Sequence, residues 1–242
     1  MKDIETHKRE IAGNGYTIID KIYSNPEIEM LLKIISHADT SKPNFRKTTR
    51  LFAIRRFLNE IPETQALIFT KKLNTLITSL FGEGYFVVKS IYFDKPGDSN
   101  WFVSYHQDLT ISVDRKTDIP GFGPWTVKEQ QFAVQPPLSI LQQNFTIRIH
   151  LDETNENNGA LRVIPGSHVK AIYRPEKIDW TLESKAVCEV SKGGIMIMRP
   201  LLQHASGRTI NHQSRRVIHI EFSNQRLPEP LNWSELQQID FI

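Results

Sequence analysis

Cysteine is almost absent from this chain of 242 residues, in which Cys188 is the single thiol. One cysteine cannot form an internal disulfide, which favours a reducing compartment, and its strand-like context predicts a buried, unreactive thiol. No apolar run approaches the ~20 residues that span a bilayer. The opening residues, Met1 to Glu5, lack the apolar segment of a signal peptide. We therefore expect a cytoplasmic protein without a membrane segment.

A strong excess of one charge is also lacking, because the formal net charge is only +3. A nucleic-acid-binding protein usually carries a clustered basic stripe. The densest basic cluster here runs from Arg46 to Arg56 and is interrupted by apolar residues. We interpret it as a solvated edge with some buried arginines rather than a site for a polyanion, and we expect no nucleic-acid partner.

Helix signals dominate the N-terminal third of the chain. Residues 24–27 supply a cap residue, an early proline and an acidic first turn. An apolar stripe at helical spacing follows at Ile28, Leu31, Leu32 and Ile35. A second helix is predicted from about Glu63 to Phe81, and Gly82 is a suitable stop.

After Gly84 the sequence has the character of strands. β-branched and aromatic residues, separated by Gly, Pro and Asn turns, are concentrated in residues 85–93, 145–151, 161–164, 194–198 and 217–222. Short strands behind a helical section predict a mostly β fold, a sandwich or barrel with a helical buttress. We expect a single domain over residues 1–242, with a mainly helical part at 1–83 and a β core at 84–225. The proline-rich stretch 109–141 is expected to be a functional loop or lid.

The sequence also contains a pattern suited to iron. A non-haem iron oxygenase needs two histidines and one carboxylate on one side of the metal. Residues i and i+2 of a strand share a face, so His-x-Asp on a strand or strand end can supply two of these ligands. The chain offers His106-Gln107-Asp108, His150-Leu151-Asp152 and His219-Ile220-Glu221. A lone strand histidine is more often structural, and spacing alone does not decide between the first two pairs.

Further landmarks follow in order after His106-Gln107-Asp108. They are Asn158-Gly159-Ala160-Leu161, continuing to Pro165-Gly166-Ser167-His168, then His204-Ala205-Ser206, and finally an arginine eleven residues after His204, Arg215. From the middle onward the sequence resembles the phytanoyl-CoA dioxygenase family, which carries these motifs in this order. The resemblance covers about residues 85–222, and the N-terminal helix also fits the family.

The resemblance implies a double-stranded β-helix core, of the jelly-roll or cupin-like kind, and a ferrous iron bound by His106, Asp108 and His204. It puts His150 and Asp152 on the strand before the Asn-Gly turn, away from the metal. His168 would fix a turn. The remaining histidines, His7, His37 and His212, are expected at the surface.

The resemblance also implies 2-oxoglutarate and O2 as cosubstrates, and ascorbate as a supporting reductant. Arginine suits the distal carboxylate of 2-oxoglutarate because its planar fork pairs bidentately and keeps its charge. Arg215 and Arg216 point to opposite faces of a strand, and Arg215 has the spacing of the family. Ser206 matches a position that helps to hold the same carboxylate. Arg148 falls at a cosubstrate-contacting position where the human enzyme type has Trp, and many relatives have Asn at the position of Thr209.

The expected reaction is hydroxylation of a C–H bond in a small-molecule metabolite, with release of succinate and CO2. A desaturase or cyclase on the same site and a non-catalytic binding module remain alternatives. Because Asp108 is present, halogenation is disfavoured, and the absent basic stripe disfavours a nucleic-acid demethylase. The oligomeric state, monomer or homodimer, stays open. Stretches 109–141 and 172–180 would form the substrate mouth, with Trp125, Lys128, Gln130, Gln131, Arg174 and Trp180.

Overall fold

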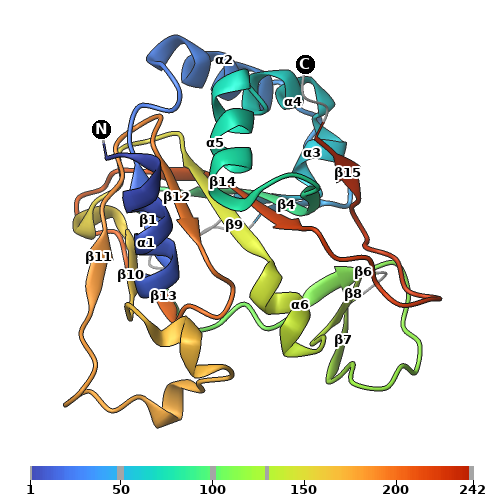
Figure 1. The fold of residues 1–242 in the computed structure, drawn as a ribbon. Coiled ribbons are helices and arrows are strands. Elements are labelled where there is room, and N and C mark those ends of the chain that lie inside the picture. Colours follow the sequence, from blue (N-terminus) through green and yellow to red (C-terminus); the bar gives the residue numbers. More distant parts are fainter. Residues whose placement is uncertain (1, 48–51, 99–101, 129–130, 240–242) are drawn as a thin grey trace.

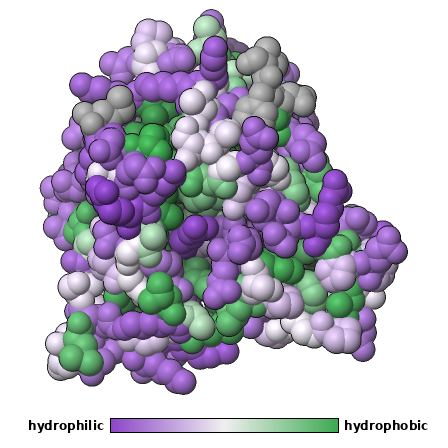
Figure 2. Space-filling view, viewed as in Figure 1, coloured by the Kyte–Doolittle hydropathy of each residue, from purple (hydrophilic) through white to green (hydrophobic). Residues whose placement is uncertain are grey.

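The computed structural model describes residues 2–47, 52–98, 102–128 and 131–239. Arg50 of the basic cluster and Gln130 of the expected mouth lie outside the described residues. Helices gather on one side of a large twisted sheet, and a small separate sheet lies at the other end (Figure 1). No helix in the described part of the chain has the length and apolar character needed to cross a membrane. The face in Figure 2 is largely hydrophilic, with scattered hydrophobic residues.

The N-terminal part is mainly helical, with three short strands between the helices. The helices are α1 (Ile4–Asn14), α2 (Asn25–Ser36), α3 (Phe57–Glu60), α4 (Gln65–Ile68) and α5 (Lys71–Phe81), with a 3-10 turn η1 (Pro62–Thr64). The strands are β1 (Tyr16–Ile19), β2 (Phe45–Lys47) and β3 (Phe52–Arg55). Ser24 caps α2 through a reciprocal pair of bonds with Glu27, as the sequence indicates.

Two expectations for this part were wrong. The helix expected over residues 63–81 is interrupted at Phe69 and Thr70, because the Thr70 hydroxyl accepts the backbone N–H of Leu73 and so starts a new helix, α5. His7, expected at the surface, is 3% exposed. Its Nδ1 lies 2.8 Å from the hydroxyl of Thr17 on β1, so packing of α1 against β1 buries it.

Two antiparallel sheets form the core. The first has the order β1-β12-β9-β14-β4-β3-β2, and the second has the order β11-β10-β13-β5. The core strands are β4 (Phe86–Lys95), β5 (Val103–His106), β9 (Phe145–His150), β10 (Leu161–Val163), β11 (Ala186–Cys188), β12 (Ile195–Met198), β13 (His204–Ser206) and β14 (Arg215–Ser223). Consecutive core strands alternate between the two sheets, except that β10 and β11 both lie in the second sheet, and this is the order of a double-stranded β-helix. The predicted fold class is therefore confirmed.

The outer face of the larger sheet is covered by helices. Its outward residues, among them Ile147, Ile218 and Phe222, pack with apolar residues of α2 and α5 in the main hydrophobic core. The ring of Phe145 stacks between Phe81 and Phe222, with centroid distances of 3.8 and 4.8 Å. Because side chains alternate along strands, the opposite parity of β4, β9 and β14 faces the second sheet. The functional side chains lie on that inner face.

The stretch 109–141 is not a loop or lid without structure, as the sequence suggested. It folds into a three-stranded sheet, β6 (Ile111–Val113), β8 (Gln131–Val134) and β7 (Trp125–Lys128), followed by α6 (Leu138–Gln143). Its prolines mark the turns between these elements, and Ile111, Val113 and Val134 are buried in a core of their own with Trp233. The short elements η2 (Glu156–Asn158), η3 (Ser167–Lys170), η4 (Pro175–Lys177) and β15 (Gln237–Gln238) complete the fold.

The aromatic stack gives a test of this packing. Phe145→Ala should lower the free energy of unfolding by about 3–5 kcal/mol, because it removes a fully buried ring between two others. Leu182→Ala is the control, since Leu182 is 82% exposed, and it should change stability by less than about 0.5 kcal/mol. Denaturant unfolding measures both. Equal effects of the two substitutions on the free energy of unfolding would show that the aromatic stack does not stabilise the core.

Candidate metal and cosubstrate site

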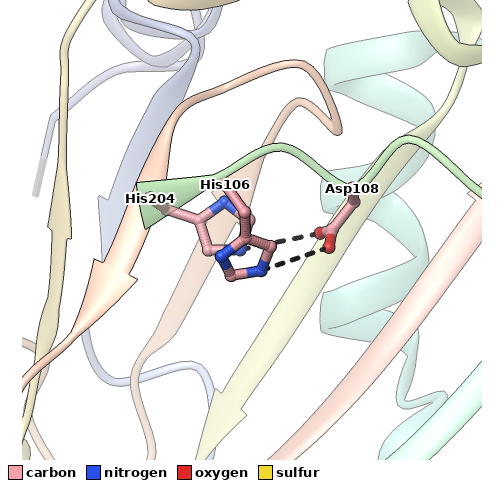
Figure 3. A group of neighbouring side chains, drawn as sticks. All are labelled: His106, Asp108 and His204. Carbon is pink, nitrogen blue, oxygen red and sulfur yellow. Dashed lines mark ion pairs between the residues drawn. The ribbon is translucent and has the colours of Figure 1, made fainter. Parts of the chain in front are cut away.

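Three side chains suited to iron meet between the two sheets. His106 ends β5, and the antiparallel register sets it opposite His204, the first residue of β13. Asp108 follows two residues after His106, beyond the strand end. One donor atom from each of the three lies within 4.8 Å of the others, and Figure 3 shows both imidazoles turned toward the carboxylate. The Nε2 atoms lie 3.9 Å (His106) and 3.8 Å (His204) from Asp108 oxygens.

Backbone carbonyls set the tautomer of both imidazoles. Nδ1 of His106 lies 2.8 Å from the Ser104 carbonyl, and Nδ1 of His204 lies 2.9 Å from the Leu202 carbonyl. A carbonyl oxygen only accepts, so each Nδ1 carries the hydrogen and each Nε2 keeps a free lone pair. Second contacts of this kind orient metal-binding histidines. The two lone pairs are thereby presented to one point in front of Asp108.

Asp108 is held by its own backbone and by its neighbour. Its N–H donates to the Pro200 carbonyl at 2.9 Å. Gln107, 8% exposed, points the other way: its amide nitrogen donates to the carbonyls of Ala171 and Leu201, and its amide oxygen accepts the N–H of Tyr173. The middle residue of His-x-Asp thus ties three chain segments together. Sequence reasoning gave Gln107 no role.

The charge state of the site also suits a cation. Burial alone would raise the pKa of Asp108, but His204, His219, Lys89 and His106 lower it to about 2. Burial lowers the pKa of His204 to about 4, against the opposing effect of Asp108. At neutral pH Asp108 is therefore an anion and His204 is neutral, which are the forms that bind a metal.

A cavity of about 240 Å³ adjoins these three residues. It is lined by the three cosubstrate residues predicted from sequence, Arg148, Ser206 and Arg215, and by Phe93, Val103, Leu161 and His219. Ser206 is 6% exposed, and its hydroxyl finds no hydrogen-bond partner among the described residues. Such an unpaired buried donor is suited to an incoming acceptor.

Arg215 brings a buried positive charge to the cavity. It is 4% exposed, and one of its NH groups donates to the Gly159 carbonyl. Burial, and then the charge of Arg148, lower the pKa of Arg215 to about 9. The described residues place no carboxylate in ion-pair contact with it. A desolvated guanidinium without a counter-ion favours a carboxylate ligand.

Two residues near this cavity were missed or undervalued by sequence reasoning. Lys95, fully buried, donates to the Gly207 carbonyl, and burial together with Arg215 lowers its pKa to about 8. It lies opposite Arg215, at the end of β4; the alternating pattern of Lys89, Ile91 and Phe93, extended by two residues, would have found it. His219 was expected to be structural, and it lines the cavity.

The side chains of the competing pair, His150 and Asp152, do not converge on one point. His150 Nδ1 lies 2.8 Å from the Thr154 hydroxyl, and burial, with Arg148 and Arg215, lowers the pKa of His150 well below its usual value. Asp152 points away and pairs with Arg216, its two oxygens accepting Nε and an NH2 group at 2.9 and 2.6 Å. Arg215 and Arg216 thus face opposite sides of β14.

The other histidines and the cysteine lie apart from the cavity. His168 Nε2 lies 3.1 Å from the Ala12 carbonyl, which ties the Pro-Gly-Ser-His turn to α1. His37 and His212 are exposed, as expected. Cys188 is 1% exposed, so the expected burial is confirmed, and burial raises the pKa of its thiol to about 12.

Comparison with known proteins agrees with this geometry. The sequence model of the phytanoyl-CoA dioxygenase family matches residues 11–217. The chain belongs to the phytanoyl-CoA dioxygenase family. A curated relative from Stutzerimonas stutzeri, a probable alpha-ketoglutarate-dependent hypophosphite dioxygenase, is 25% identical over 189 residues. That alignment covers 71% of this chain and 56% of the relative, so the chain spans little more than half of that protein's length.

Solved structures share the fold at low identity. EctD from S. alaskensis with bound Fe superposes with a TM-score of 0.72 at 17% identity, over 93% of this chain and 79% of that one. The non-heme alpha-ketoglutarate-dependent epimerase SnoN from nogalamycin biosynthesis gives a TM-score of 0.68 at 13% identity, over 98% and 96% of the two chains. Both likenesses cover more than nine tenths of this chain.

The residues of this family member fit ferrous iron. Two imidazoles and one carboxylate with open positions are the donor set of non-haem Fe(II) oxygenases, whereas structural zinc sites use four closed ligands. His106 is also the most open of the three, with a side chain that is 40% exposed. The three residues would therefore hold the metal from one side and leave the other side to small molecules.

Removal of single ligands tests the metal site. Substitution of outer-contact residues typically lowers metal affinity about 10–100-fold, so His106→Ala and Asp108→Ala, which remove a ligand itself, should lower Fe(II) affinity by more than about 100-fold. His150→Ala is the matched control and should keep the affinity of the wild type. Anaerobic Fe(II) titration, with circular dichroism to verify folding, measures both. Loss of Fe(II) in His150→Ala with retention in His106→Ala would reverse the assignment.

Proposed function

We propose that this protein is an Fe(II)- and 2-oxoglutarate-dependent dioxygenase that hydroxylates a C–H bond of a small-molecule metabolite, releasing succinate and CO2. The observation that carries the proposal is a shared cavity. Its wall contains His106, Asp108 and His204, and the same cavity of about 240 Å³ contains the buried guanidinium of Arg215. A chelating dicarboxylate needs both features together.

The cavity residues have complementary tasks toward 2-oxoglutarate. Arg215 would pair with the distal carboxylate through its planar fork, and the unpaired hydroxyl of Ser206 would donate a second bond to it. Arg148 would contribute positive charge to the same cavity. Its NH group donates to Nδ1 of His219 at 3.0 Å, which keeps the guanidinium in place. Phe93 and Leu161 supply the apolar walls.

The metal and the protein divide the chemistry between them. Bound iron would couple the oxidative decarboxylation of 2-oxoglutarate by O2 to the oxidation of a substrate C–H bond. The chain binds and orients the reactants, because the two histidines and Asp108 occupy one side of the metal and leave the remaining positions open. Burial of His204, Ser206 and Arg215 excludes water from the cosubstrate.

The substrate is proposed to be a small molecule. Stutzerimonas stutzeri hypophosphite dioxygenase, by its name, and SnoN, by its role in nogalamycin biosynthesis, both act on small molecules. The same site could run desaturation, cyclisation or epimerisation, which use the same cosubstrate. The product mass separates three outcomes: hydroxylation adds one oxygen, desaturation and oxidative cyclisation each remove two hydrogens, and epimerisation changes nothing. Mass spectrometry of metabolite extracts incubated with the protein, Fe(II), ascorbate and 2-oxoglutarate measures this change in mass.

Turnover without a prime substrate tests the enzyme assignment. The purified protein with Fe(II), O2 and ascorbate should slowly convert 2-oxoglutarate to succinate, because the cosubstrate and the metal have a complete site. Omission of iron and the Asp108→Ala variant are the controls, and both should abolish succinate formation. Absence of both turnover and calorimetric 2-oxoglutarate binding in the iron-loaded protein would exclude this function.

Adjacent arginines provide a matched test of the cosubstrate site. Arg215→Leu should weaken 2-oxoglutarate binding by about 2–5 kcal/mol, because a buried charge-assisted pair is lost and the carboxylate is left without its partner. Arg216→Leu removes the same side chain from the opposite face and breaks only the pair with Asp152. It should lower stability slightly and leave 2-oxoglutarate affinity within about twofold of wild type. Calorimetry at constant metal concentration measures both, and a larger loss in Arg216→Leu would contradict the model of the site.

A further inference from the structure

A second cavity lies beside the iron ligands, with a volume of about 350 Å³. We propose that it is the prime-substrate pocket and that it selects a small molecule carrying an oxyanion, a carboxylate or phosphate-type group. This inference rests on the proposed function and names its substrate class. The volume is near the small end of the range for ligand pockets, about 300–1,000 Å³.

The two cavities follow one another along the same strands. On the inner face of β4, Phe93 lines the cosubstrate cavity, and Ile91 and Lys89 line the second one. On the chain that leaves β5, Asp108 lines the first cavity and Thr110 lines the second. The boundary between the two cavities therefore lies beside Asp108, one of the three proposed metal ligands. A substrate in the second cavity would reach the metal side without crossing the protein interior.

Strand pairing places the positively charged Arg55 beside the residues that line the two cavities. His219 lies opposite Arg148 on one side and opposite Ile91 on the other, and Ile91 in turn lies opposite Arg55 on β3. Directly opposed residues share a face of the sheet. The side chain of Arg55 therefore belongs to the inner face, in the same cross-strand row as His219 and Arg148. The basic cluster, interpreted from the sequence as a solvated edge with some buried arginines, supplies part of the cavity wall.

The charge of the cavity wall is predominantly positive. Among the described residues, Arg55, Arg56, Lys89 and Lys128 line it, against one lining carboxylate, Glu235. That carboxylate is 3% exposed and already accepts the hydroxyl and N–H of Ser90, at 2.6 and 3.2 Å. Both of its oxygens therefore already accept a hydrogen bond from Ser90.

The arginines of the wall have only neutral acceptors among the described residues. Arg55 NH1 donates to the Gln131 amide oxygen at 2.7 Å, and Arg56 NH2 donates to the Ser234 carbonyl at 3.2 Å. These bonds hold the guanidinium groups without neutralising them. An oxyanion that entered the cavity would gain the uncompensated charge, and arginine forks match its geometry.

Lys89 completes the wall and connects it to the first cavity. Its ammonium donates to Glu221 Oε1 at 2.7 Å, and the same oxygen lies 3.1 Å from His219 Nε2. Arg148 only donates, so His219 Nδ1 accepts from it and Nε2 carries the hydrogen toward Glu221. Glu221 thus fixes Lys89 at the wall, and two ammonium hydrogens remain for a ligand.

The remaining lining residues indicate the chemistry of the rest of the substrate molecule. Ile91, Val113 and Phe132 offer apolar surface, and Thr110, Ser112 and Thr126 offer hydroxyls. A short carbon skeleton fits the apolar part while its oxyanion contacts the cations. A cationic amine would meet several like charges, which costs binding free energy. Of the mouth residues expected from sequence, Lys128 and Gln131 line this cavity, whereas Arg174 and Trp180 do not.

Binding of matched probes tests the proposal. The protein is loaded with Ni(II) and saturating 2-oxoglutarate, so that the first cavity is filled and no turnover occurs. Butyrate and inorganic phosphate are the anionic probes, butyramide is the neutral probe and butylamine is the cationic probe. Calorimetry should show that the anions bind at least about tenfold more tightly than the neutral and cationic probes.

Single substitutions test whether the anions bind in the second cavity. Arg55→Gln should weaken anion binding by about tenfold or more, whereas Arg174→Gln, an exposed arginine outside the cavity, should not. Arg55→Lys keeps the charge, loses the fork and should have an intermediate effect; it also serves if Arg55→Gln does not fold. Failure of 2-oxoglutarate itself to bind would overturn the proposed function. Binding of 2-oxoglutarate with no preference for anions, or equal losses in Arg55→Gln and Arg174→Gln, would overturn only the substrate class.

Discussion

The pairing of β5 with β13 is the constraint on which the site depends. It sets His106 opposite His204, and two backbone carbonyls then fix both imidazoles with Nε2 free. A register irregularity between His204 and Ser206 shifts the pairing, so that Val103 lies opposite Ser206 and both line the smaller cavity. One short strand pair therefore positions the two candidate metal-binding histidines and part of the cavity wall.

Burial of charge shapes the inner face of the larger sheet. A buried ion is costly unless it is paired and hydrogen-bonded. Lys89 and Glu221 meet this requirement as an ion pair, and His219 joins Glu221 to Arg148 in a continuous chain of donors and acceptors that links the two cavities. Arg148 and Arg215 do not meet it, since their described contacts are to neutral groups. A ligand carboxylate would complete the compensation that the protein leaves open.

Local sequence patterns predicted the strands, the capped helix α2 and the opposite facing of Arg215 and Arg216, because alternation and capping are properties of neighbouring residues. They could not predict that Arg55 faces the interior, because that depends on the pairing of β3 with β4 across intervening helices. The buried position of His7 depends likewise on tertiary packing against Thr17. The prediction of the metal ligands depended on the family resemblance, because spacing alone did not distinguish His106 from His150.

The ion pair between Asp152 and Arg216 has a consequence for folding specificity. Two consecutive arginines make β14 ambiguous, because a slip by one residue would still point a guanidinium into the barrel while turning every other side chain over. The contacts of Asp152 favour the observed register. It accepts the backbone N–H as well as the side chain of Arg216, and this arrangement needs Arg216 on the outer face. A carboxylate on the outside of the barrel thus helps to direct Arg215 to the inside.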